Sequence, residues 1–282
     1  MFSVGVLSWK AHDTLRKTLS SYRHLLPLVD EAVVFFNSIS DEDRGIAREF
    51  GFRDEGSSEN LGILGGTLSL VRHLHGDVVM LLQNDNPINV SSDTLAKRIA
   101  SARSLIDDGV ADIVRMRDRF DPTFSDRMKY LRYWPDENGC DTLKLRVRRF
   151  LRPFKALRMA GRAPDVLQNP SVRHSRIFSD VSGAFVSDSR YVNYSDQPLM
   201  VRRSLILELL EWADAHKQGR RTLNGLAVPE IIINGAYWRR RKVRIAITDG
   251  VFAHARFDDS FRPDNKAFNS AIASVHNENR HI

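Results

Sequence analysis

Residues 78–82 (VVMLL) form an unbroken apolar run that stops abruptly at the polar sequence QNDNP, residues 83–87. A strand that is apolar on both faces is typical of a parallel sheet covered by helices on both sides. Ligands of such open sheets bind outside the carboxyl ends of the strands. Asp85, an aspartate between two amides at that place, is suited to hold a divalent cation against phosphate oxygens. A polar turn after a core strand explains the same residues, and both interpretations stay open.

The first 116 residues alternate between strand and helix signals. Apolar strand-like runs at residues 3–7, 31–36, 78–82 and 111–116 are separated by segments with helical spacing. Gly62, Gly65 and Gly66 are predicted to lie in a loop before a short helix at residues 67–73. The alternation predicts a parallel sheet with right-handed crossovers, and therefore an α/β fold.

The second half is less regular. Residues 117–188 show no sustained period, apart from one basic helix-like run. An apolar helix is predicted at residues 204–216, and two strands at 242–248 and 251–256 precede a polar tail from residue 263. We expect one domain over residues 1–262 and a C-terminal tail over 263–282.

Positive charge is concentrated in one segment. The chain carries a net charge of +7, and residues 127–162 alone hold eleven Lys or Arg against three Asp or Glu. Within this segment, apolar residues recur at helical spacing from Leu143 to Leu157, and Pro153 should kink or split the helix. Such a helix suits the interface of an anionic membrane, although a solvated basic face explains it too. No aromatic stacking platform accompanies the charges, so no nucleic-acid partner is expected.

The rest of the composition is that of an ordinary globular protein. The 282 residues contain no window approaching the roughly 18 uncharged apolar residues of a membrane span. Cys140 is the single cysteine, so an internal disulfide is excluded. The first residues have no basic lead followed by an apolar core, and a cytoplasmic location is therefore expected, with peripheral membrane contact through the basic segment.

Several motifs, in their order along the chain, resemble glycosyltransferases of the GT-A fold, in particular the inverting family 2. SVGVLSWKAHDTLRKTLSSY resembles that family's first strand and helix, and residues 60–66 (NLGILGG) resemble its "ENxGxxxG" stretch. LLQNDNPI resembles the strand that ends in its DxD-type motif. Pro229-Glu230 stands where the family has an acidic catalytic pair, and VFAHARF resembles its distal strand with a histidine.

The resemblance implies a GT-A-like fold with a mostly parallel central sheet flanked by helices, carrying the basic segment as a partly helical insertion. Residues 1–116 would bind a nucleotide sugar, and residues 117–262 would bind a glycan or glycolipid acceptor. The implied activity is an inverting transfer of the sugar to an acceptor hydroxyl. Fold analogy does not identify the sugar.

The resemblance also assigns roles to residues. Glu230 would be the general base that takes the proton of the acceptor hydroxyl. Asp85 and His254 would hold Mn²⁺ or Mg²⁺ at the donor diphosphate. The expected substrate-binding residues are Ser8, Trp9, Asn37, Asn60, Gly62, Gly65, Gln83 and Asn84. Should Glu230 not be the base, the irregular region offers Asp180, Asp188 and Asp196.

The chain departs from the family pattern at three places. Gln83 replaces the first carboxylate of the DxD motif, Phe36 stands where an aspartate usually contacts the nucleoside, and Glu230 has no acidic neighbour in the sequence. These departures favour a first alternative, a non-catalytic glycosyltransferase-like binding subunit. A second alternative is a nucleotidyltransferase, although SWKAHD is a poor version of the Gly-rich loop expected after its first strand.

Overall fold

The computed structural model describes residues 1–120, 126–196, 198–222 and 225–255, and the structural statements below concern these residues. The strands are β1 (Phe2–Ser8), β2 (Glu31–Phe36), β3 (Arg53–Gly56), β4 (Val78–Gln83), β5 (Ile113–Arg117), β6 (Ser179–Val181), β7 (Ala184–Asp188), β8 (Leu199–Arg202) and β9 (Arg244–Phe252). The α-helices are α1 (His12–Ser21), α2 (Asp41–Glu49), α3 (Gly62–His73), α4 (Ser92–Asp107), α5 (Asp126–Leu131), α6 (Leu143–Leu151), α7 (Pro153–Ala160), α8 (Pro170–Arg173), α9 (Arg203–Ala215), α10 (Pro229–Ile233) and α11 (Ala236–Arg241). Short 3₁₀ helices are η1 (Tyr22–His24), η2 (Leu26–Leu28) and η3 (Ala163–Asp165).

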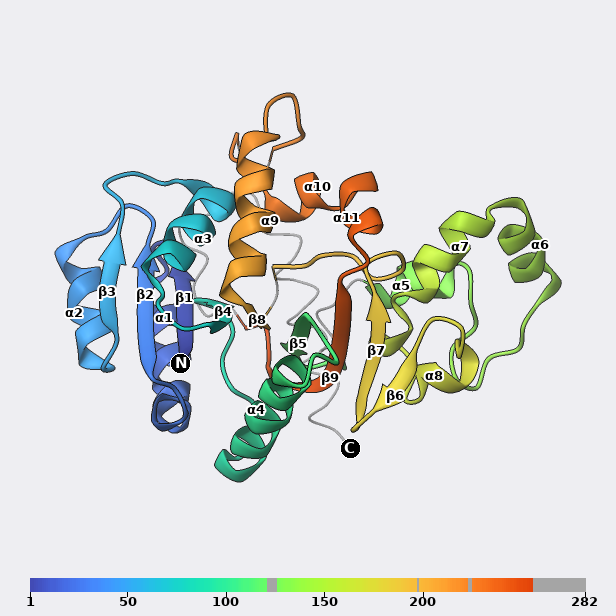
Figure 1. The fold of residues 1–282 in the computed structure, drawn as a ribbon, viewed down its shortest axis with the longest axis horizontal. Helices are drawn as coiled ribbons and strands as arrows, with labels where there is room; N and C mark the ends of the chain where they lie inside the picture. The colour runs from blue at the N-terminus through green and yellow to red at the C-terminus, as the bar shows by residue number, and fades with distance from the viewer. Residues whose placement is uncertain (121–125, 197, 223–224, 256–282) are drawn as a thin grey trace, which may run out of the picture.

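The strands form one mixed sheet in the order β3-β2-β1-β4-β8-β5-β9-β7-β6 (Figure 1). Strands β1 to β4 are mutually parallel, as the sequence predicts. β8 runs antiparallel between β4 and β5, β9 is parallel to β5, and β7 is antiparallel to β9. The predicted α/β class with a central sheet and flanking helices is therefore confirmed. The sheet is mixed and not mostly parallel, because β8 and the β6–β7 hairpin pair antiparallel with their neighbours.

Two apolar cores lie on the two faces of the sheet, because successive side chains of a strand point to opposite faces. Leu7 and Leu81 pack on one face, in the core that contains α3 and α9. Val6 and Leu82 pack on the other, with α1, α2 and α4. The unbroken apolar run of β4 supplies both cores, so its sequence shows no alternation.

The glycines after Asn60 lie in a helix and not in the predicted loop. Helix α3 begins at Gly62 and contains Gly65 and Gly66. A Cβ at Gly66 would lie 2.7 Å from Leu7 Cδ1 and 2.8 Å from Asn37 Nδ2. Glycine is therefore needed because α3 packs directly on the sheet, a close approach that a loop prediction from glycine content overlooks.

The second half contains strands that the sequence does not reveal. β8 has four residues and continues directly into α9, so its apolar residues are indistinguishable from the start of that helix. β6 and β7 occupy part of the supposedly irregular region. The two strands predicted at 242–248 and 251–256 are one strand, β9, whose pairing with β5 shifts register near Gly250 (φ +67°). Arg256 and the tail 263–282 lie outside the described residues.

Helices α6 and α7 carry the basic segment, and the chain divides between them at Pro153, as predicted. We call them the basic helix pair. They lie at the end of the molecule opposite α2 (Figure 1). Phe150 and Phe154 are 84% and 82% exposed, and α6 has no buried residue. Among the described residues, no helix has the length and apolar character needed to cross a membrane.

Candidate functional site

Asp85 lies in a hydrogen-bonded turn at the carboxyl end of β4. The N–H of Gln83 donates to Asn86 Oδ1 (2.8 Å), and the N–H of Asn84 donates to the carbonyl of Leu7 at the end of β1 (3.0 Å). Asp85 itself is 1% exposed. Because the turn already fixes this buried carboxylate, ligand binding costs little further conformational entropy at Asp85.

His254 reaches Asp85 because the chain leaves β9 and runs beside the turn. The N–H of Ala253 donates to the carbonyl of Pro87 (2.9 Å), and the N–H of Ala255 donates to the carbonyl of Asp85 (2.8 Å). His254 Nε2 thereby lies 3.4 Å from Asp85 Oδ2. The sequence placed these two residues together as metal ligands, and the structure brings them together across 169 residues.

The Asp85–His254 pair offers one carboxylate and one imidazole to a metal ion. Both groups bind Mn²⁺, and Mg²⁺ prefers oxygen ligands. Within the described ranges, no cluster of three or more His, Cys, Asp or Glu side chains could hold a metal ion. The pair therefore fits a site in which substrate phosphate oxygens and water complete the coordination, as is common for Mg²⁺.

Glu230 stands at the start of α10, and a second carboxyl group lies against it. Its Oε1 accepts hydrogen bonds from Ser195 Oγ (2.7 Å) and from the N–H of Asp196 (3.1 Å). Burial raises the pKa of the Asp196 carboxyl well above its ordinary range, and the charge of Glu230 and a hydrogen bond to it add to the rise. Glu230 has no acidic neighbour in the sequence, but Asp196 supplies one in space.

The two carboxyl groups can hold one proton between them. The raised pKa favours the protonated form of Asp196, whose O–H can then donate to Glu230. Glu230 is thereby held in one orientation by three hydrogen bonds. Pairs of carboxyl groups whose environments separate their pKa values are typical of acid–base sites.

Gln83 connects the two groups of residues. Its Nε2 donates a long hydrogen bond to the backbone carbonyl of Asp196 (3.4 Å), and the charge of Asp85 contributes to the raised pKa of Asp196. The residue that replaces the first carboxylate of the DxD motif thus contacts the loop that carries Asp196. The carboxyl end of β4, the loop before β8 and the start of α10 therefore meet at one place.

The raised pKa of Asp196 predicts a stability change on mutation. A group whose pKa is raised by folding stabilises the protein below its ordinary pKa, and this contribution is lost as the pH rises. Asparagine cannot ionise, so Asp196→Asn should not lose stability as the pH rises. Its Tm should therefore exceed that of the wild type increasingly from pH 4 to pH 8, by about 2–4 °C for each kcal/mol of unfolding free energy that the wild type loses.

Thermal unfolding across this pH range measures the difference, with Asp180→Asn as the control because Asp180 is an exposed aspartate of the same half. A Tm difference that does not grow with pH would contradict the raised pKa.

The expected donor-binding residues divide into two groups. Ser8 is buried at the end of β1, and its Oγ accepts a hydrogen bond from Asn84 Nδ2 (3.4 Å). Trp9 follows and is partly exposed, with Lys10 Nζ 5.4 Å from its ring centroid. Both positions lie beside the Asp85 turn, because β1 and β4 are neighbours in the sheet.

The second group surrounds the start of α3. Asn37 is buried at the end of β2, its Nδ2 donates to the carbonyl of Gly62 (3.1 Å), and its Oδ1 has no hydrogen-bond partner among the described residues. Asn60 Oδ1 accepts from the N–H of Gly62 (2.9 Å). At Gly62 and Gly65, an added Cβ would meet Leu226 and Leu61, both within 3 Å, so the close approaches here are to the chain's own side chains.

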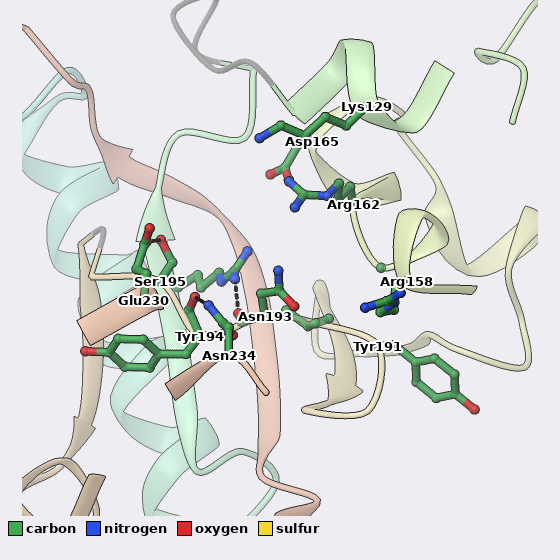
Figure 2. A pocket seen from close by; sticks show the side chains of 13 residues that line it. Lys129, Arg158, Arg162, Asp165, Tyr191, Asn193, Tyr194, Ser195, Glu230 and Asn234 are labelled. Carbon is green, nitrogen blue, oxygen red and sulfur yellow. Dashed lines mark hydrogen bonds between the residues drawn. The ribbon is translucent and has the colours of Figure 1, made fainter. Parts of the chain in front are cut away.

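A polar cavity of about 250 Å³ is lined by Glu230 but not by Asp196 or Gln83. Figure 2 shows Ser195, Glu230 and Asn234 on one side of it and Lys129, Arg162 and Asp165 on the other. Arg115, from β5, also lines it and donates to the carbonyl of Asn193. The sequence offered no indication of this cavity, because its walls come from β5, α5, α7, η3 and the loop before β8.

No protein-family model matches the sequence, and no curated protein is significantly similar to it. Solved structures with similar coordinates include a nucleotidyl transferase from Methanothermobacter thermautotrophicus (14% identity, TM-score 0.44, covering 88% of this chain and 86% of that one).

Glucosyl-3-phosphoglycerate synthase from Mycobacterium tuberculosis, in complex with Mn²⁺, UDP and its product, is similar at 14% identity and a TM-score of 0.46, covering 98% and 78%. A mannosyltransferase from Pyrobaculum calidifontis, in complex with GDP-Man and Mn²⁺, is similar at 15% identity and a TM-score of 0.47, covering 92% and 58%.

Proposed function

We propose that the chain transfers a sugar from a nucleotide-sugar donor to a hydroxyl group of a glycan or glycolipid acceptor, with inversion and with the help of Mn²⁺ or Mg²⁺. One observation carries the proposal. The Asp85–His254 pair and the Glu230–Asp196 pair lie at the same edge of the sheet, linked through Gln83. A cation-binding group beside a base is what such a displacement requires. The order of the motifs along the sequence supports the same function.

The residues have separate tasks in the proposed reaction. Glu230 accepts the proton of the acceptor hydroxyl while the oxygen of that hydroxyl attacks the anomeric carbon. Asp196 and Ser195 keep the carboxylate of Glu230 oriented. The bond between the anomeric carbon and the diphosphate oxygen breaks, and the nucleoside diphosphate leaves with the bonding electrons. A single displacement of this kind inverts the configuration. Asp85 and His254 would hold a metal ion, which supplies positive charge at the departing diphosphate.

Donor binding is assigned to residues 1–116 and acceptor binding to residues 117–262. Ser8, Trp9 and Asn84 lie beside Asp85 and would contact the donor directly. The buried Oδ1 of Asn37 lacks a partner within the described part of the chain, and a donor hydroxyl or base N–H would satisfy it. Glu230 accepts a hydrogen bond from Asp196 and also lines the polar cavity, where the acceptor would bind.

A thermal-shift screen tests the donor site. We expect one class of nucleotide sugar to raise the Tm in the presence of manganese and to have little effect in EDTA. A ligand at 100 times its dissociation constant stabilises by about 2.7 kcal/mol, which is readily measured. Stabilisation by nucleoside triphosphates but by no nucleotide sugar would contradict the proposal and favour a nucleotidyltransferase.

We also propose that the protein is cytoplasmic and that the basic helix pair holds it at an anionic membrane. Phe150 and Phe154 are exposed, and Leu143 and Leu151 are 77% and 70% exposed. A groove along the pair is lined by these leucines together with basic side chains, among them Lys144 and Arg152. Apolar side chains surrounded by cations are typical of helices that lie in a membrane interface.

Vesicle co-sedimentation tests this contact. Each basic residue near an anionic surface contributes about 1 kcal/mol, so Lys144→Ser/Arg152→Ser should weaken binding by more than 10-fold at low salt. Phe150→Ser/Phe154→Ser should weaken it at both low and high salt. Arg149 is left unchanged, because it binds Asp141 and the carbonyl of Tyr133.

Val172→Ser is the matched control, since Val172 is also 82% exposed but lies on α8. An equal loss of binding in the Val172 variant, or a wild-type protein that ignores anionic vesicles, would contradict the membrane contact.

A further inference from the structure

The cavity beside Glu230 is positively charged. Its charged lining consists of four cationic side chains and two carboxyl groups, namely Arg115, Lys129, Arg158, Arg162, Asp165 and Glu230. The cations come from β5, α5, α7 and the turn after α7. Because they come from four segments, their meeting is not a by-product of one helix having a basic face. The formal charge of the lining is therefore +2 around a cavity of about 250 Å³.

Two of the cations are held away from water. Burial lowers the pKa of the Arg115 guanidinium, and Asp165 and Glu230 only partly oppose this. Burial also lowers the pKa of Arg162, and the charge of Arg115 lowers it further, while Asp165 and Glu230 partly oppose this. Two partly dehydrated guanidinium groups thus line one cavity together with Lys129 and Arg158, and this excess of cations over carboxyl groups suits an anion as ligand.

Arg158 adds charge at the exposed side of the cavity. It forms no ion pair within the described ranges, and its charge contributes to lowering the pKa of Arg239. Asp165 is the one acidic side chain among the lining residues besides Glu230. A network that served only to stabilise the fold would be expected to balance its charges, and this one does not.

From this arrangement we infer that the cavity binds a phosphate monoester group carried by the acceptor, and so places the acceptor's hydroxyl at Glu230. A phosphate monoester carries about −1.5 to −2 charges at pH 7, which matches the balance of the lining. Arginine forks suit phosphate oxygens. The inference rests on the proposed function and narrows its acceptor to a phosphorylated hydroxy compound.

The phosphate can belong to a free molecule or to a lipid headgroup. Lys129 lines both the cavity and the groove of the basic helix pair, so the two adjoin at this residue. A soluble acceptor would use the cavity alone. A lipid acceptor would place its headgroup in the cavity and its chains toward Leu151 and the neighbouring apolar side chains.

Isothermal titration of the full chain with sn-glycerol 3-phosphate tests the inference, with glycerol as the neutral comparison. We expect the phosphate to bind and glycerol not to bind. Arg158→Gln and Arg162→Gln should each weaken binding by about 10- to 100-fold, as for a lost hydrogen bond between charged groups. Lys155→Gln is the matched control, since Lys155 is a basic residue of the same helix that does not line the cavity. Arg158 is exposed, so its variant should fold even if Arg162→Gln does not.

A second arm identifies the source of the phosphate. Vesicles containing phosphatidic acid, a monoester, are compared with vesicles containing phosphatidylglycerol, a diester. A preference for phosphatidic acid that Arg158→Gln abolishes would assign the cavity to a lipid headgroup. Binding of glycerol phosphate alone would assign it to a free molecule. If neither probe binds, or if Arg158→Gln and Lys155→Gln weaken the binding of glycerol phosphate equally, the inference is wrong.

Donor binding is measured on the same samples, by the thermal shift that a nucleotide sugar and manganese produce. Donor binding without phosphate binding would overturn this inference and leave the proposed function intact. Phosphate binding that depends on Arg158, without any donor binding, would keep the cavity assignment as a phosphate site and remove the proposed function.

Discussion

Glu230→Gln should lower turnover by about 10²- to 10⁴-fold, the range typical for the loss of a general base, and should barely change donor affinity. The amide oxygen of glutamine can still accept the hydrogen bonds from Ser195 and from the N–H of Asp196, so the local structure should be preserved. The amide cannot take a proton, however. Steady-state kinetics and donor titration of the same protein separate the two effects.

Ser195→Ala provides the control for this experiment, because it removes one hydrogen bond to Glu230 but leaves the carboxylate. We expect a much smaller loss of turnover from it. A Glu230→Gln protein that keeps most of its turnover would exclude Glu230 as the base and direct attention to Asp196, which lies against it.

Asp85→Ala should abolish turnover and should also remove the dependence of donor binding on manganese or magnesium. Asp85 is the buried carboxylate at the end of β4, and His254 alone would leave one protein ligand. Asp85→Asn keeps the shape of the turn and should show the same loss, so that any folding defect of the alanine variant can be recognised by circular dichroism.

Asp93→Asn is the matched control, since Asp93 is an exposed aspartate at the start of α4. Wild-type turnover that persists undiminished in excess EDTA would contradict a metal role for Asp85. Direct binding of the donor sugar would then be its remaining role.

The first half of the fold follows from the sequence because its signals are local. Buried parallel strands need apolar residues on both faces, and residues 32–36 and 78–82 provide them without interruption. The glycines of α3 were misplaced, since glycine favours loops locally, while the contact of Gly66 with Leu7 is a tertiary fact. β8 is not evident from the sequence for a related reason, because three apolar residues and an arginine directly before a helix carry no period of their own.

The site was predictable only where a motif carried it. The proximity of Asp85 and His254 followed from the order of the motifs, and their role as metal ligands is still a proposal. Asp196 could be named only as one aspartate among three, because its pairing with Glu230 joins segments 34 residues apart. The charge of the polar cavity is not visible in the sequence for the same reason. Arg115 and Arg158 are unremarkable in the sequence, and only the fold brings these residues of β5 and α7 to one cavity.

Chromatography of the nucleotides formed from a mixture of nucleotide sugars tests the central claim most directly. The wild-type protein with manganese should release nucleoside diphosphate from one class of donor, faster when a phosphorylated hydroxy compound is present, and EDTA or Glu230→Gln should suppress the release. With added pyrophosphate, the appearance of nucleoside triphosphate and sugar 1-phosphate in place of nucleoside diphosphate would contradict the assignment of this chain as a glycosyltransferase. No release from any donor under these conditions would contradict it as well.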